Sequence, residues 1–153
     1  MSTIAAVYRI DIPSLTSAVG LWDQKKYAEF WEVMASCEPF SFPYSGYVLG
    51  AAIAFANSRG VKLPQKTDLQ ILSSEHRKAI GLLAMGNAAD FAPAASGLAD
   101  LRATDPEFRR FYNDLYDHDW DEAATAMREG FSFLERAIRT IEFTDDLLLV
   151  TAH

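Results

Sequence analysis

Apolar residues recur at strand spacing at the two ends of the chain and at helical spacing between them. Ile4, Ala6, Tyr8 and Ile10 lie on one face of a period-two pattern, which predicts a strand over residues 3–10. The apolar run 147–151 predicts a second, buried strand. We therefore expect an α+β fold, predominantly helical, in which the two terminal strands form a small sheet packed on about six helices. An all-α fold is the alternative if the end segments are irregular.

The helical patterns differ in strength along the chain. The segment 47–57 is apolar on all sides and rich in small residues, so we expect it to be the central helix, closed by Gly60 in a left-handed conformation. Thr104, Pro106 and Glu107 give the strongest start signal, a capping box with proline in the first turn. The other predicted helices cover about residues 13–22, 23–37 with Asp23 as N-cap, 75–85, 90–102 and 119–143.

Two segments between helices are predicted to be loops. Residues 38–46 contain two prolines, which oppose a helix, and three aromatic residues, Phe40, Phe42 and Tyr44. These rings either face a ligand or partner or pin the loop to the core. Residues 61–72 are expected to form a polar surface connection. With no repeat or linker, residues 1–153 are predicted to form a single domain.

Charge is distributed unevenly along the chain. The net charge is −7; residues 1–99 contain eight acids and eight bases, whereas residues 100–153 contain thirteen acids and six bases. This sign argues against nucleic acid as a partner and favours a basic protein partner, or solubility alone. The start Met1–Ile4 lacks the features of a signal peptide, and the longest apolar run, 47–56, is about half of a membrane span. We expect a cytoplasmic protein that does not bind a membrane.

The acids are densest in the stretch Tyr112–Glu122, which holds five acids, no lysine or arginine, and His118. Asp119, Asp121 and Glu122 are expected to begin the last helix, where a positive helix end favours anions. Asp114 and Asp117 lie in the last turn of the preceding helix, where the helix dipole disfavours them. No local rule explains these two residues, and three interpretations remain: a solvated turn, a docking surface for a basic partner, or a hydrolytic or metal site.

No sequence motif supports the catalytic interpretation. The spacing of Asp114, Asp117 and His118 matches neither a calcium loop nor a zinc motif, and the chain has no G-x-S-x-G, H-E-x-x-H or phosphate-binding loop. We accordingly predict no cofactor and no metal.

Both ends of the chain resemble the YfbM-like family of uncharacterised bacterial proteins. The resemblance rests on the opening strand Thr3–Ile10 with its short helix, and on Phe133–Ala137 leading to the strand Leu147–Val150. The tryptophan-bearing helix Tyr27–Met34 is similar to one in that family, although the histidine-containing continuation is missing. Membership would imply no particular reaction.

The leading hypothesis is a small binding protein without catalysis, in its most concrete form an immunity-type protein that neutralises a basic partner through the acidic C-terminal half. The expected contact residues are Asp114, Asp117, His118, Tyr112, Phe40, Phe42 and Tyr44. A hydrolase or metal-dependent enzyme using Asp114, Asp117 and His118 is one alternative. A homo-oligomeric structural protein, joined through the segment 40–44, is the other.

Overall fold

The computed structural model describes residues 3–37, 41–67 and 69–153, and these form seven helices and four strands. In chain order the elements are β1 (Ile4–Ile10), α1 (Ile12–Asp23), α2 (Tyr27–Ser36), β2 (Ser41–Ser45), α3 (Gly46–Ser58), α4 (Ser74–Ala79), β3 (Leu82–Gly86), α5 (Ala88–Asp100), α6 (Asp105–Tyr116), α7 (Ala123–Arg139) and β4 (Leu147–Ala152).

The two terminal strands pair in the middle of one antiparallel sheet, in the strand order β2-β1-β4-β3. Val7 lies opposite Val150, and the register is unbroken from Ala5–Ala152 to Ile10–Leu147. The prediction of a mostly helical α+β fold with a sheet made by the chain ends is therefore confirmed, and the all-α alternative is wrong. The sheet gains an edge strand on each side that the sequence pattern did not indicate.

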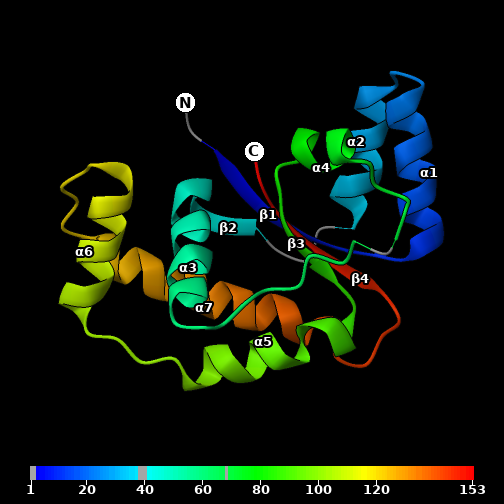
Figure 1. Ribbon diagram of the computed structural model, residues 1–153. Coiled ribbons are helices and arrows are strands. Elements are labelled where there is room, and N and C mark those ends of the chain that lie inside the picture. The colour runs from blue at the N-terminus through cyan, green and yellow to red at the C-terminus, as the bar shows by residue number, and fades with distance from the viewer. Residues whose placement is uncertain (1–2, 38–40, 68) are drawn as a thin grey trace.

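Helices cover both faces of this sheet (Figure 1). Successive residues of β1 alternate between the two sides: Ala5 and Val7 join the core under α3, α5 and α7, whereas Ala6, Tyr8 and Ile10 join the core under α1 and α2. Because both faces are covered, the central strands are apolar along almost their whole length. Helix α6 lies outside this arrangement, packed against α3 and α7.

The predicted central helix is confirmed as α3. Its small residues permit close packing: a Cβ added at Gly130 of α7 would lie 3.1 Å from the Cβ of Ala52. Gly60 follows the helix with a φ of 81°, the left-handed conformation expected for it.

Residues 41–45 form strand β2 rather than the predicted loop. Pro43 is compatible with a strand here because β2 is an edge strand, where a missing N–H breaks no ladder between two neighbours. Phe42 is buried and Tyr44 half-buried, so these rings follow the interpretation in which the aromatic residues pin the segment to the core. Phe40 lies outside the described residues.

The predicted helix 75–85 is also wrong, because only α4 is helical there. Gly81 adopts a φ of 64°, which ends the helical path, and residues 82–86 pair with β4 as strand β3. The connection 61–72 is closer to the sheet than predicted: Lys66 N–H donates to the Met85 carbonyl at 2.9 Å, and Met85 N–H donates to the Pro64 carbonyl at 3.0 Å. This contact covers the outer edge of β3.

Asp23 does not cap the second helix as predicted. It is the last residue of α1, and α2 begins four residues later, after Lys25 turns the chain with a φ of 60°. Within the residues described above, no helix is both long enough and apolar enough to cross a membrane.

Candidate protein-binding surface

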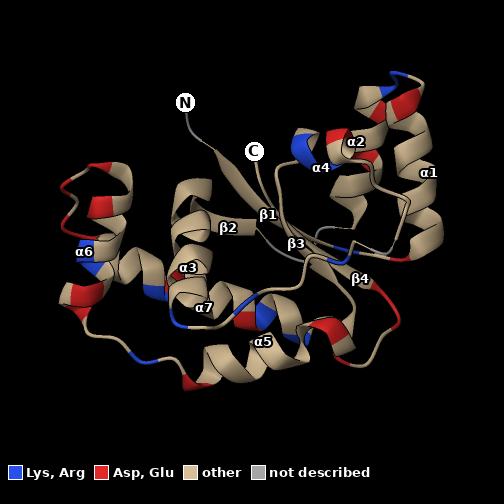
Figure 2. Cartoon of the chain, viewed as in Figure 1, with Lys and Arg blue, Asp and Glu red and all other residues tan. Residues whose placement is uncertain are grey.

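The acidic stretch Tyr112–Glu122 lies at the C-terminal end of α6 and in the turn to α7. Helix α6 starts as predicted: Thr104 Oγ1 accepts a hydrogen bond from Glu107 N–H at 3.3 Å, and a Glu107 carboxylate oxygen accepts one from Thr104 N–H at 2.6 Å. That second bond is the main reason why the pKa of Glu107 lies below its ordinary value. The helix then runs to Tyr116 and delivers the acidic residues to one end of the molecule (Figure 2).

Asp117 has a conformational role that the sequence pattern did not indicate. It ends α6 in the left-handed conformation, with φ 48° and ψ 54°, and its backbone N–H donates to the Asn113 carbonyl. Aspartate and asparagine adopt this conformation more readily than most other residues with a side chain. Its place at the unfavourable end of the helix dipole is therefore explained by backbone geometry.

The α6–α7 turn, residues 117–122, is tied back to α6. Arg109 forms ion pairs with Asp119 at 3.1 Å and with Asp121 at 2.6 Å, both on the exposed surface. The side-chain amide of Asn113 hydrogen-bonds both the N–H and the carbonyl of the Trp120 backbone. The turn is thus held in place by two residues that lie one helical turn apart.

The predicted role of Asp119 as the cap of the last helix is wrong. Helix α7 begins at Ala123, with Glu122 in the N-cap position and no side-chain hydrogen bond at the cap. Asp119 and Asp121 pair with the guanidinium of Arg109 instead. Glu122 is exposed, and its backbone carbonyl accepts from Ala126 N–H at 3.0 Å.

Aromatic rings fill the space between this turn and α3. Tyr112 contacts Tyr116 and Trp120, with ring centroids 5.0 and 5.3 Å apart. Tyr116 contacts Tyr47, whose carbonyl accepts a 2.8 Å hydrogen bond from the Tyr116 hydroxyl. Burial is the main cause that raises the pKa of Tyr112 and Tyr116 above the ordinary value of 10.0, and neighbouring tyrosines add to it.

The structure separates the predicted contact residues into a buried and an exposed group. Tyr112 and Phe42 are only 8% and 7% exposed, so both rings belong to the core and are not available to a partner. Tyr44 is half-buried, 6.5 Å from the ring of Trp120. Asp114, Asp117 and His118 are exposed.

Two further exposed side chains, both largely apolar, belong to the same end of the molecule and were not among the predicted contact residues. Leu115 is 47% exposed and Tyr47 is 44% exposed. We call the set Tyr47, Asp114, Leu115, Asp117 and His118 the acidic–apolar surface. Throughout the described ranges, no side-chain ion pair or hydrogen bond involves Asp114 or Asp117, so both carboxylates are available to an external cation.

This geometry gives no support to a metal or hydrolytic centre at Asp114, Asp117 and His118. No group of three or more His, Cys, Asp or Glu side chains is placed to hold a metal ion in the part of the chain that the structure describes. The groove between α6 and α7, with a volume of about 440 Å³, is lined by Asp105, Pro106, Arg109, Arg110, Asn113, Asp121, Ala124 and Thr125. The three residues of the enzyme hypothesis do not contribute to it.

Comparison with protein-family models, with curated proteins and with solved structures finds no match to this chain. The resemblance to the YfbM-like family therefore stays a prediction.

Proposed function

We propose that this protein binds a basic protein partner through the acidic–apolar surface, and that it acts as an immunity-type protein which neutralises that partner. The observation that carries the proposal is the pair of exposed carboxylates, Asp114 and Asp117, which have no ion pair or hydrogen bond among the described residues. They share the C-terminal end of α6 with the half-exposed Leu115, and the half-exposed Tyr47 packs on Tyr116 in the same helix turn. Protein interfaces commonly combine an apolar or aromatic centre with a charged rim.

The charge distribution supports the same proposal. Residues 100–153 hold the whole excess of negative charge, thirteen acids against six bases. A field of this sign speeds the encounter with a positively charged protein and slows the encounter with an acidic one. The braced α6–α7 turn supports it further, because a preformed surface loses little conformational entropy on binding.

The test measures association with the protein encoded by the neighbouring gene, using stopped-flow kinetics at low and high salt. We expect the association rate constant to fall about tenfold or more when the salt concentration is raised, since salt screens exposed charges. At low salt the double variant Asp114→Asn, Asp117→Asn should associate more slowly than the unmodified protein. Asparagine keeps the left-handed preference at 117, so this variant changes charge and not the turn.

A matched control is available on α2. Glu29→Gln with Glu32→Gln removes the same charge from two exposed positions on a helix that covers the opposite face of the sheet. This control should retain a nearly unchanged association rate. A rate constant independent of salt, equal losses in both double variants, or no association at all would contradict the proposal.

A further inference from the structure

A second exposed feature lies at the other end of α7, in the α7–β4 turn, residues 140–146. Phe143 in this turn is 95% exposed, more than any other large hydrophobic residue among those described. Ile141, which precedes it in the chain, and Leu147, which follows the turn, are fully buried. The turn therefore displays one aromatic ring in solvent between two residues anchored in the core.

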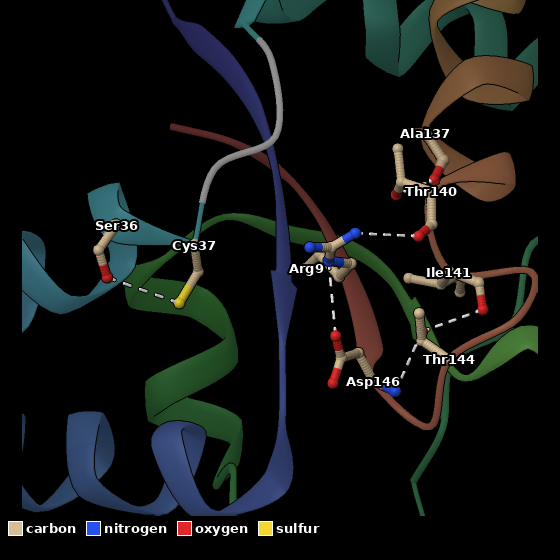
Figure 3. Close-up of polar contacts among 8 residues, drawn as sticks. All are labelled: Arg9, Ser36, Cys37, Ala137, Thr140, Ile141, Thr144 and Asp146. Carbon is tan, nitrogen blue, oxygen red and sulfur yellow. Dashed lines mark hydrogen bonds and ion pairs between the residues drawn. The ribbon is translucent and has the colours of Figure 1, made fainter.

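The backbone that carries Phe143 is held firmly (Figure 3). Arg9 of β1 donates from Nη1 to the Thr140 carbonyl at 3.2 Å, and its Nε lies 3.5 Å from an Asp146 carboxylate oxygen. Thr144 Oγ1 donates to the Ile141 carbonyl at 3.1 Å and accepts from Asp146 N–H at 3.3 Å. The Arg9 guanidinium thus joins the first and last residues of the turn, and the Thr144 hydroxyl joins Ile141 to the last residue, Asp146.

This bracing distinguishes Phe143 from an apolar residue on a loose loop. Single exposed apolar residues are common on protein surfaces and need no explanation by themselves. An aromatic ring on a preformed turn is different, because a partner that receives it does not have to order the backbone. Aromatic residues placed in this way often carry much of the binding energy of an interface.

The charges beside Phe143 indicate what kind of partner fits. Glu142 and Asp145 flank it, both are exposed, and neither forms an ion pair within residues 3–37, 41–67 and 69–153. An anionic membrane would be repelled by these carboxylates. A second copy of this chain carries the same acids and the same net charge of −7, so self-association would bring like charges together.

We propose that the α7–β4 turn is a second protein-docking site, in which Phe143 enters an apolar pocket of a partner whose rim carries lysine or arginine side chains that meet Glu142 and Asp145. It is separate from the acidic–apolar surface. The 17 residues of α7 place the two turns about 25 Å apart, and the ends of this helix lie on different sides of the molecule (Figure 1). The proposal does not depend on the first surface being functional.

The experiment replaces Phe143 with the photoreactive residue benzoylphenylalanine in the full chain, expressed in the cell from which the protein comes. Irradiation should give one main adduct with another protein. We expect the adduct yield to fall about tenfold when Glu142→Lys and Asp145→Lys are added, because they reverse the charges that meet the basic rim. The same probe at Tyr27, which is 45% exposed on α2, is the matched control and should not give this adduct.

Other products would overturn the proposal. Adducts with lipid would indicate a membrane contact, and adducts with the chain itself would indicate self-association. The same adduct from the probe at Tyr27, a yield unaffected by the lysine variants, or no adduct would each contradict a basic partner at Phe143. Because the Phe143 ring and the side chains of Glu142 and Asp145 are exposed, the variants at these three positions should keep the thermal stability of the unmodified protein, which circular dichroism can verify.

Discussion

The side chain of Asn113 binds both backbone groups of Trp120. Asn113 Oδ1 accepts a hydrogen bond from Trp120 N–H at 3.1 Å, and Asn113 Nδ2 donates one to the Trp120 carbonyl at 3.4 Å. The Asn113 amide thus gives Trp120 the same donor and acceptor that the backbone of a neighbouring strand would give it. These two bonds fix the loop that carries the acidic residues and hold the Trp120 ring against Tyr112.

Asn113→Ala should lower the free energy of unfolding by about 1–2 kcal/mol, because two part-buried backbone groups lose their partner. Chemical denaturation measures this loss. Asn57→Ala in α3 is the matched control: Asn57 is exposed, and no hydrogen bond of its side chain is present among the described residues. That variant should be as stable as the unmodified protein or slightly more stable, because alanine favours helix. An equal change in the free energy of unfolding for both variants would show that the two Asn113–Trp120 hydrogen bonds contribute no stability.

Substitutions at Asp117 should separate backbone geometry from charge. Because its φ of 48° is left-handed, Asp117→Gly should match or exceed the stability of the unmodified protein by up to about 1 kcal/mol, and Asp117→Val should lose about 1–2 kcal/mol. Asp117→Asn should change stability by less than about 0.5 kcal/mol. Thermal unfolding gives this order directly. A valine variant as stable as the glycine variant would contradict a conformational role for residue 117.

Elements with strong local signals could be predicted from the sequence. The start of α6 follows from Thr104, Pro106 and Glu107, three neighbouring residues that satisfy the helix end by themselves. The pairing of β1 with β4 follows from two apolar segments at the chain ends that need a partner. In each case the sequence contains the whole physical reason for the structure.

Elements that depend on distant partners could not be predicted in this way. Residues 82–86 have an apolar pattern that fits a helix as well as a strand, and only pairing with β4 decides between the two. Asp119 and Asp121 fit a helix N-terminus by composition, yet they bind Arg109, which lies ten residues before Asp119. The sequence did not indicate that Leu115 and Tyr47 are exposed for the same reason, since their exposure depends on where α6 packs against α3.

The buried Tyr112 and the half-buried Tyr116 should make the free energy of unfolding depend on alkaline pH. Burial raises the pKa of Tyr112 and Tyr116 in the folded protein above 10.0, so the folded state holds these protons more tightly than the unfolded state. Their contribution to stability is fully present below about pH 10 and is lost as the pH rises through the raised values. We therefore expect the free energy of unfolding to fall above about pH 10.

Tyrosinate absorbance measures the same effect directly. In the folded protein a late phase should follow the main titration, and Tyr112→Phe and Tyr116→Phe should each remove part of it. In denaturant all tyrosines should titrate together near the ordinary value. A single phase in the folded protein, or a late phase that neither substitution reduces, would contradict the burial that raises the pKa of these two hydroxyls.

Two glycines should respond to alanine in opposite directions. Gly81 has a φ of 64°, and a Cβ added there would meet the carbonyl of Ala152, whose N–H donates to the Gly81 carbonyl at 2.8 Å. Gly81→Ala should therefore destabilise the protein by more than about 2 kcal/mol, since it combines left-handed strain with a clash against the end of β4. Gly20 lies within α1, and an added Cβ there would have no neighbour within 4 Å. Gly20→Ala should stabilise the protein by about 0.5–1 kcal/mol through helix propensity.

Urea denaturation of both variants provides the comparison, and amide hydrogen exchange of Ala152 should increase in Gly81→Ala alone. If Gly81→Ala were as stable as Gly20→Ala, the left-handed connection from α4 into β3 would be wrong.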